Sequence, residues 1–490
     1  MAKKTFSTLE KILDFSDFSK GINYDDGKTI NGEGACNGYN FNYFNGVLTQ
    51  GLGVKKFTIQ TSGTVANEKE FDYNKPLEFY SFSSLSKKET IMLVLDASTY
   101  TLKRCYLKAL SEEGYTSITQ FAVRPITINY TYNYVNYLLF SAEGKFCVFD
   151  DNYNITTYNV STENRIYDVV SHTGFVFVVK NTDIKRVVYY CNDLNPHNII
   201  ANLSQMKTIT IPSELGNIVK LVSYDDYLYI FCEYGIYRLV NYTGKKQITL
   251  EPVFNGTKII LRNTIVQAGT SLVFMSQDGV YTLNGLKVKK LDLKINRLFK
   301  TLTNEGAKAV YINGYYYVAC AMEFGDGLNI GAQGNNYYPN DTVLCVDLDN
   351  ERVLVNRGIV LHDLSMLMGY KTNLVLCVSY KLGTSSIREL NFTGEYATDN
   401  PVKKMWQTYY KDASLPNKTK ICKKLFIKTA TNIMVKVGYD DNFKTIKVSG
   451  KNTLQEIPVN VKGKKFNLTI ECETATAHIS EAKLLVGVYE

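Results

Sequence analysis

Hydrophobic and polar residues alternate in short runs along most of the chain, and turn residues separate the runs. In the segment 221–239 the first two runs meet at an Asp-Asp pair and the next two at a Tyr-Gly pair. The same plan recurs at 265–283, where the turns fall at Gly269–Thr270 and Asp278–Gly279. Turn residues between alternating runs are a strong signal for hairpins. Each segment therefore predicts three consecutive antiparallel strands.

Weaker copies of this plan repeat through the middle of the chain. The first turns of the copies lie near positions 88, 136, 173, 226, 270, 314 and 373. A spacing of about 45 residues is typical of a four-stranded propeller blade. We therefore expect an all-β chain in which residues 76–402 form a β-propeller of about seven blades. Six or eight blades stay open as alternatives, because the first and last copies are faint.

The pattern changes after residue 402. Four strands of alternating apolar and polar residues follow, at Lys424–Lys428, Ile433–Gly438, Phe466–Glu471 and Lys483–Tyr489. Alternation of this kind over a short segment predicts a C-terminal antiparallel β-sandwich over residues 403–490. The remaining residues, 1–75, are expected to form an N-terminal arm and strands that close the propeller.

Two segments interrupt the repeats. Apolar residues follow a helical period at Leu291, Ile295, Leu298, Phe299 and Leu302. This period predicts a short amphipathic helix between two blades, which packs on the core or, alternatively, contacts another subunit. The segment Gly325–Asn340 is a long polar loop. Loops of that length often carry function, and contact with a neighbouring subunit is our hypothesis for this one.

The composition agrees with strands and sets few limits on partners. The chain has 37 Tyr and 24 Phe against one Trp and 9 Pro, which suits pleated, half-buried surfaces. Its net charge of +8 is spread thinly, since eight Lys-Lys pairs occur but none extends into a longer block. Scattered lysines favour solubility and protect strand edges. A nucleic-acid surface would need them on one face, which the sequence does not show.

The ten cysteines are scattered through apolar runs, and no C-x-x-C pair occurs. Cys232 and Cys345 are typical, because each lies inside an apolar strand pattern. Such residues behave as small buried apolar groups, so we expect assembly in a reducing compartment. The first residues lack the apolar centre of a signal peptide, and no run of about 20 apolar residues exists. We therefore expect no membrane-spanning segment.

Catalytic motifs are missing from the sequence. The four histidines, His172, His197, His362 and His478, have no metal-ligand spacing. Neither a G-x-S-x-G elbow nor a phosphate loop occurs, and the three glycines within 325–331 have the wrong spacing for one. We therefore predict no catalytic, cofactor-binding or metal-binding residues, and no enzymatic activity.

Two acidic segments are interpreted as turns. Asp225–Asp226 lies between two strands of one repeat, and Asp347–Glu351 lies between two others. Asp347–Glu351 lacks the central Gly and the terminal Glu of a calcium loop. Paired carboxylates can also hydrolyse glycosides, but that needs a separation in space that the sequence does not give.

Several short motifs occur in one order along the chain and resemble those of tailed-phage tail proteins. The first three are Phe15–Asp26, Asn37–Leu48 and Gly51–Phe57. They resemble a "GGIN" element, an "x-N-x-x-F-x-x-G-x-L" element and a "G-y-x-k-f" element at the opening of such proteins. The blade ending in Asp278–Tyr281 is similar to their middle, and Trp406–Thr408 to the segment before their terminal sandwich. One departure is Lys20, which stands where the first glycine of "GGIN" would be.

In particular, the chain is similar to the propeller-containing tail nozzle, or tail-stabilisation, proteins that connect head and tail in short-tailed phages. The resemblance implies a structural virion protein whose copies form a homo-oligomeric ring, with a hexamer favoured. The ring would lie below the portal, extend the DNA channel and help to retain and release the genome during ejection. Implied partners are the portal, adaptor and other tail proteins, and double-stranded DNA in transit. Implied location is the virion tail, after assembly in the bacterial cytoplasm, with the N-terminal arm lying across or between subunits.

Two other readings of the sequence stay open. One is a carbohydrate-binding or receptor-binding propeller at the virion surface, which a cluster of acidic or aromatic residues on one face would favour. The other is a cytoplasmic scaffold, because a propeller fold does not by itself fix a function.

Overall fold

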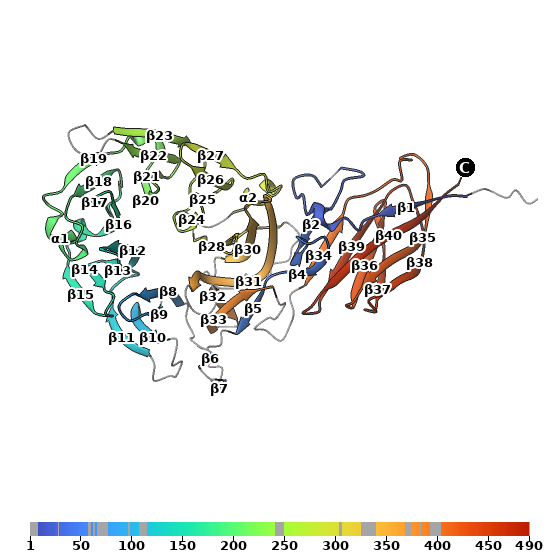
Figure 1. The fold of residues 1–490 in the computed structure, drawn as a ribbon. Coiled ribbons are helices and arrows are strands. Elements are labelled where there is room, and N and C mark those ends of the chain that lie inside the picture. Colours follow the sequence, from blue (N-terminus) through green and yellow to red (C-terminus); the bar gives the residue numbers. More distant parts are fainter. Residues whose placement is uncertain are drawn as a thin grey trace, which may run out of the picture.

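The chain folds into a ring of small sheets joined to a flat two-layer body (Figure 1). The computed structural model describes residues 8–27, 29–56, 60–61, 64–65, 77–96, 99–106, 115–240, 249–302, 306–324, 340–367, 374–381, 384–392 and 403–489. The ring is a β-propeller and the flat body is a β-sandwich, as the sequence predicts.

Five of the blades are separate four-stranded antiparallel sheets. Within each blade the strands run in the following order from the innermost to the outermost. Blade 1 has β8 (Leu77–Ser84), β9 (Glu89–Asp96), β10 (Thr101–Tyr106) and β11 (Tyr115–Gln120). Blade 2 has β12 (Ile126–Tyr132), β13 (Val135–Ala142), β14 (Lys145–Phe149) and β15 (Ile155–Asn159). Blade 3 has β16 (Ile166–His172), β17 (Phe175–Lys180), β18 (Val187–Cys191) and β19 (Lys207–Thr210). Blade 4 has β20 (Ile218–Tyr224), β21 (Tyr227–Cys232), β22 (Gly235–Val240) and β23 (Thr249–Asn255). Blade 5 has β24 (Val266–Ala268), β25 (Ser271–Ser276), β26 (Gly279–Asn284) and β27 (Lys287–Lys290).

Blades 6 and 7 share one long strand, β31 (Arg352–Leu367). Its first part pairs with β30 (Asn340–Asp347) as the outermost strand of blade 6, which also contains β28 (Lys308–Ile312) and β29 (Tyr315–Cys320). Its second part, from Leu361 onward, pairs with β32 (Leu374–Lys381) as the innermost strand of blade 7. The two blades therefore form one continuous seven-stranded sheet, and the ring has seven blades.

The ring closes with a strand from the N-terminal part of the chain. β5 (Gly53–Lys56) pairs antiparallel with β33 (Thr384–Asn391) and supplies the outermost strand of blade 7. At the centre, the second part of β31 contacts β8, so that blade 7 lies against blade 1. The last blade is thus built from both ends of the propeller segment, which joins the two ends of the ring.

The turns expected from the repeats are the hairpins that join each innermost strand to the next strand outward. They fall at 85–88, 133–134, 173–174, 225–226, 269–270 and 313–314. The seventh, near 373, lies outside the described residues. In blades 1 to 6 the second strand is packed between neighbouring blades, which explains its continuous apolar run. In β21, for example, Leu228 to Cys232 are all fully buried, and each such large apolar side chain stabilises the fold by roughly 1.5–3 kcal/mol.

The sandwich takes strands from both ends of the sequence. One sheet has the order β3-β4-β40-β35-β38, with β1 paired beside β4 on β40, and the other has the order β2-β34-β39-β36-β37. The N-terminal strands are β1 (Thr8–Asp14), β2 (Ala35–Tyr39), β3 (Phe41–Asn42) and β4 (Leu48–Gln50). The C-terminal strands are β34 (Lys404–Thr408), β35 (Lys420–Thr429), β36 (Ile433–Tyr439), β37 (Asn442–Val448), β38 (Leu454–Gly463), β39 (Phe466–Cys472) and β40 (His478–Tyr489). The sandwich therefore extends beyond 403–490 into the segment expected as an arm.

Helices are short and few among the described residues. The segment 291–302 forms only one turn of helix, α2 (Asn296–Phe299). Four of the five apolar residues of the period are buried as predicted, and Leu302 is partly buried. Lys294 has a φ of 57°, which prevents the helix from starting earlier. The loop expected at 325–340 lies outside the described residues, except for Asn340 at the start of β30. The other short elements are η1 (Phe18–Lys20), η3 (Thr162–Asn164), η4 (Pro196–Asn198), α1 (Ile199–Asn202), η5 (Ser213–Leu215), η6 (Arg262–Thr264) and the pair β6 (Gln60–Thr61) and β7 (Thr64–Val65).

Candidate functional site

Each blade places one charged residue at or just before the start of its innermost strand. We call this set the charged ring: Glu78, Arg124, Asp168, Lys220, Arg262, Lys308 and Asp363. Because the innermost strands of a propeller all run in the same direction, these residues lie toward one end of the propeller axis. The ring is therefore a candidate for whatever the propeller centre does.

Asp168 is the centre of one half of the charged ring. Its carboxylate accepts a hydrogen bond of 2.6 Å from the backbone N–H of Leu221 in the next blade. It also pairs at 3.3 Å with Arg262, which donates to the Tyr167 carbonyl and stacks over the Tyr167 ring. Lys220 donates to the Ile265 carbonyl at 3.0 Å. Blades 3, 4 and 5 are joined in this way by side chains, where no strand ladder connects them.

Asp363 has the equivalent role in the other half of the charged ring. Its carboxylate accepts a hydrogen bond of 3.0 Å from the backbone N–H of Phe79 in blade 1 and pairs with Lys308 of blade 6. Glu78 of blade 1 pairs with Arg124, which precedes blade 2. The seam at which the propeller closes, between blades 7 and 1, is therefore fastened by a buried carboxylate.

Burial shifts the pKa of several groups in the charged ring. It raises the pKa of Glu78, against the opposing effect of Arg124. It lowers the pKa of Lys220 to about 8, helped by the nearby charge of Arg262. Burial also opposes the charge of Arg262, but Asp168 and Tyr167 outweigh it and raise the pKa of Arg262. The carboxylates are held in ion pairs, and these pairs fasten the blades to one another.

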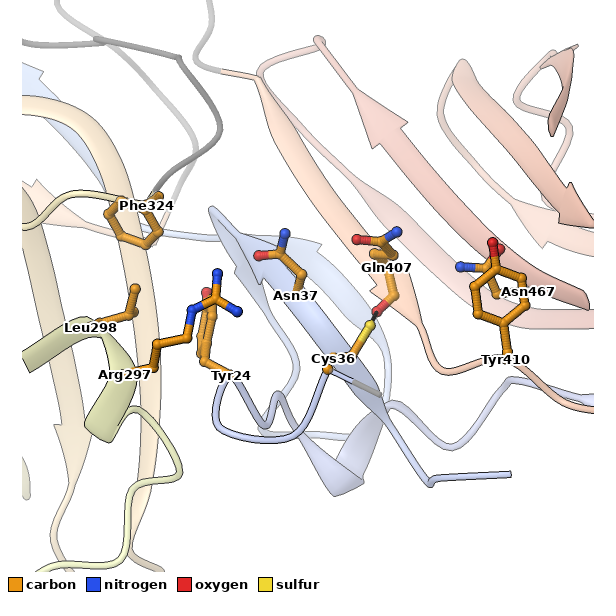
Figure 2. A pocket seen from close by; sticks show the side chains of 10 residues that line it. Tyr24, Cys36, Asn37, Arg297, Leu298, Phe324, Gln407, Tyr410 and Asn467 are labelled. Carbon is orange, nitrogen blue, oxygen red and sulfur yellow. Dashed lines mark hydrogen bonds between the residues drawn. The ribbon is translucent and has the colours of Figure 1, made fainter. Parts of the chain in front are cut away.

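A second candidate site lies between the propeller and the sandwich, and we call it the junction (Figure 2). It contains a cavity of about 210 Å³ lined by carboxamides, aromatic rings and one guanidinium. The lining residues are Tyr24, Gly27, Cys36, Asn37, Arg297, Leu298, Phe324, Gln407, Tyr410 and Asn467. This volume is below the range of about 300–1,000 Å³ that is usual for small-molecule sites. Burial raises the pKa of Cys36 to about 11, which makes its thiol a poor nucleophile.

Three aromatic residues from distant parts of the sequence form the core of the junction. Trp406 is fully buried, and its ring meets Phe18 edge-on at 5.7 Å and Tyr43 at 5.3 Å between centroids. The Tyr43 hydroxyl donates to the Val353 carbonyl of β31. This cluster therefore packs the N-terminal segment and the sandwich together, and ties both to the propeller.

A buried asparagine connects the same three parts by hydrogen bonds. The Asn40 side chain donates to the Lys403 carbonyl at 2.8 Å and to the Arg357 carbonyl at 3.1 Å, and its oxygen accepts from the Arg357 N–H at 2.6 Å. Asn40 is 1% exposed. Lys403 opens the sandwich and Arg357 lies in β31, so Asn40 fixes the angle between the two domains through backbone groups.

The opening motif has a structural explanation. Gly21 has a φ of 72°, and a Cβ on it would lie 2.9 Å from the Tyr43 ring. Only glycine suits that position. Lys20 ends the short helix η1 and is not among the described residues with positive φ, so a side chain is tolerated there. The departure from "GGIN" falls on the position that does not require glycine.

Asp25, in the same motif, holds α2 in place. Its carboxylate accepts hydrogen bonds from the backbone N–H groups of Asn296 at 3.1 Å and Arg297 at 2.7 Å. The Tyr24 N–H donates to the Lys294 carbonyl at 2.9 Å. The N-terminal segment therefore contacts the connection between blades 5 and 6 as well as β31.

The structure does not bring together the residues that the sequence offered as candidates for catalysis or ligand binding. His172 bonds Ser223 in the propeller, His197 bonds Tyr158, and His478 lies in the sandwich. The His362 side chain and the glycines at 325–331 lie outside the described parts. Asp225–Asp226 and the residues after Asp347 form turns, with Asp347 paired to Arg352 at 3.0 Å.

Histidine, cysteine and acidic side chains are scattered through the part of the chain that the structure describes. There, no three His, Cys, Asp or Glu side chains come together as a metal site would need. The eight cysteines described are free thiols. No helix in that part is both long and apolar enough to cross a membrane.

Sequence reasoning missed the charged ring and the junction. The sequence did contain a signal for the charged ring. The innermost strands at 166–172, 218–224 and 361–367 each carry a charged residue two positions after an apolar first residue. The junction had a weaker signal, namely the single Trp of the chain next to the motifs of the N-terminal segment.

Fold and sites together define the class of protein: a seven-bladed β-propeller carried on a β-sandwich that takes strands from both ends of the chain. No protein-family model matches the chain, and no curated protein matches it in sequence.

Among solved structures, streptogramin B lyase has a TM-score of 0.41 and 11% identity, over 66% of this chain and 96% of that chain. BBS1N in complex with ARL6DN has a TM-score of 0.40 and 12% identity, over 66% and 96%. The Neurospora crassa Pan2 WD40 domain has a TM-score of 0.35 and 8% identity, over 61% and 85%. Likeness at this level does not bear on what the chain binds or does.

Proposed function

We propose that this chain is a structural virion protein of a tailed phage, whose copies form a ring in the tail that extends the DNA channel. The proposal rests on one observation: residues from three of the motifs that resemble those of tail proteins lie close together in the structure. Phe18 and Gly21 come from the first motif, Tyr43 from the second and Trp406 from the last, and all four lie in the core of the junction.

The third motif supports the same proposal. It contains β5, the strand that pairs with β33 and closes blade 7. The motifs that resemble those of tail proteins thus lie where the propeller, the sandwich and the N-terminal segment are held as one body. A subunit of a channel-forming ring needs such a fixed angle between domains, because every copy must repeat the same contacts. Under this proposal the ring contacts the portal, adaptor and other tail proteins, and double-stranded DNA passes through its bore.

A carbohydrate-binding propeller is not favoured by the described residues. The acidic members of the charged ring are each paired with Lys or Arg. A glycosidase or lectin site would instead need carboxylates or aromatic faces open to a sugar.

Electron microscopy of the purified full chain, alone and with a portal ring from a short-tailed phage, tests the proposal. The expected result is a closed ring with a central bore, either formed by the chain alone or nucleated on the portal. A chain that stays monomeric at high concentration and ignores portal rings contradicts it. Binding to a glycan array by such a monomer would support the carbohydrate alternative instead.

A further inference from the structure

The sandwich has two opposite edges that differ in charge. One edge is made by β1 and the residues that follow it, 8–33, which lie beside β2. The other is made by β37, β38 and the adjoining residues, 442–465. Figure 1 shows these edges on opposite sides of the sandwich. Within the described residues, no strand pairs with the outer side of β1, β37 or β38.

The first edge is acidic and the second is basic. Residues 8–33 contain six acidic and three basic residues, a net charge of −3. Residues 442–465 contain six lysines and one glutamate, a net charge of +5. Five of those lysines are exposed: Lys444, Lys447, Lys451, Lys462 and Lys464. On the acidic edge, Glu10, Asp14 and Asp17 are exposed. Glu10 also pairs with Lys423 at 2.6 Å and Asp14 with Lys483 at 3.7 Å in the same chain, while Asp17 has no ion pair among the described residues.

Each edge also exposes large apolar side chains. Ile12 is 61% exposed and Leu9 48% on the acidic edge, and Phe443 is 63% exposed and Leu454 52% on the basic edge. Exposed apolar groups with a charged border are typical of protein contact surfaces. Lysines on an edge strand normally prevent pairing with other edges. Here they repel a second basic edge but attract an acidic one.

We infer that the acidic edge of one copy binds the basic edge of the next copy. The contact joins two different surfaces of the same chain, which is the head-to-tail geometry that closes into rings. Like charges disfavour the symmetric alternative, in which two identical edges pair. The inference rests on the proposed ring and assigns the surfaces through which its subunits meet, which places the sandwiches side by side around the bore.

Charge reversal on each edge, separately and together, tests this contact. One variant carries Glu10→Lys, Asp14→Lys and Asp17→Lys, which changes the first edge from −3 to +3. The second carries Lys447→Glu, Lys451→Glu, Lys462→Glu and Lys464→Glu, which changes the other edge from +5 to −3. The third combines all seven. Mass photometry and sedimentation of the full-length chain measure assembly. We expect either single-edge variant to shift the mass from the ring to the 55.5 kDa monomer. The seven-substitution variant, whose edges carry +3 and −3 and are complementary again, regains the ring.

Control variants place reversals of the same kind on the propeller. Glu143→Lys with Asp183→Lys, and Lys207→Glu with Lys258→Glu, change exposed residues outside both edges and should leave assembly unchanged. Unchanged thermal melting shows that all variants fold. Assembly by the wild type should also weaken as salt is raised, because the attraction is between exposed charges.

The possible results distinguish failure of the proposed edge contact from failure of the proposed oligomeric ring. If the wild type forms rings that both single-edge variants keep, the edge contact is wrong and the ring stands. If the wild type forms open chains that either reversal breaks, the contact is right and the ring is wrong. A wild type that is monomeric under every condition, portal included, overturns both.

Discussion

The charged ring and the junction hold this chain together by different means. The charged ring joins blades through ion pairs of buried carboxylates, as between Asp168 of blade 3 and Arg262 before blade 5. The paired residues are one or two repeats apart. The junction joins segments almost 400 residues apart through aromatic packing, as in Phe18 and Trp406. A buried ion pair can be replaced by apolar residues at little cost, whereas a close-packed aromatic cluster tolerates few replacements. The ion pairs that hold the blades together can therefore be replaced by apolar residues. The aromatic contacts that attach the propeller to the sandwich tolerate few replacements.

Removal of the junction tryptophan should have the largest effect. Trp406→Ala leaves a cavity in a fully buried site, and we expect it to lower the free energy of unfolding by about 3–5 kcal/mol. Urea denaturation followed by circular dichroism measures this loss. Trp406→Phe keeps most of the volume and should cost less. Equal, small losses for both variants would show that the cluster does not hold the domains together.

Removal of one partner from the charged ring should come next. Asp168→Ala leaves Arg262 half-buried without its carboxylate and the Leu221 N–H without its acceptor, which we expect to cost about 3 kcal/mol. Adding Arg262→Met should recover part of the loss, because no unpaired charge then remains. A double-mutant cycle on the free energy of unfolding measures this recovery. If the changes in the free energy of unfolding caused by the two substitutions simply add, apolar residues cannot replace the ion pair at little cost, and the description of the charged ring is wrong.

Removal of the hydrogen bonds of Asn40 should have a smaller effect. Asn40→Ala leaves the Arg357 N–H and two carbonyls unpaired in a buried place, at a cost of about 1–3 kcal/mol. The control is Asn45→Ala at an exposed position, which should stay within about 0.5 kcal/mol of the wild type. Limited proteolysis near residue 403 should also become faster in Asn40→Ala alone, because the linker between the domains loses its anchor.

The smallest expected effect is a pH dependence in the charged ring. The pKa of Lys220 falls from its ordinary 10.5 to about 8 on folding, so between these values the unfolded chain binds more protons than the folded one. Stability from this group therefore rises as pH increases from 8 to 10.5. The melting temperature of the wild type should accordingly gain on that of Lys220→Met over this interval. A constant difference between the two melting curves would show that Lys220 titrates normally.

The sequence predicted the propeller because each blade is local. Strands such as Tyr227–Cys232 pair with their sequence neighbours, and their turns carry recognisable residues. The helix at 291–302 was predicted too long, since its apolar period says nothing about the positive φ at Lys294. The sandwich was predicted in part, because its C-terminal strands alternate clearly. Its N-terminal strands are as short as the two residues of β3, and a pattern so short has no period to detect.

The candidate sites were harder to predict for a physical reason. The charged ring depends on which side chains face each other across neighbouring blades, and the one-residue bulges near Asp168 and Asp363 set that orientation. The junction depends on contacts between Asn40 and residues more than 300 positions away. No local pattern encodes such pairs. The ring role, its partners and its place in the virion stay predictions, because they rest on the resemblance motifs.

The closing strand has a consequence for how the protein is made. β5 leaves the ribosome early, but its partner β33 ends at Asn391, which pairs with Gly53. At roughly 5–20 residues per second, synthesis of the intervening chain takes on the order of tens of seconds. Throughout that interval β5 has no ladder to join, and blade 7 cannot be completed. The propeller can therefore close only after Asn391 has been translated, so a ribosome that stalls earlier leaves an open arc of blades with exposed strand edges.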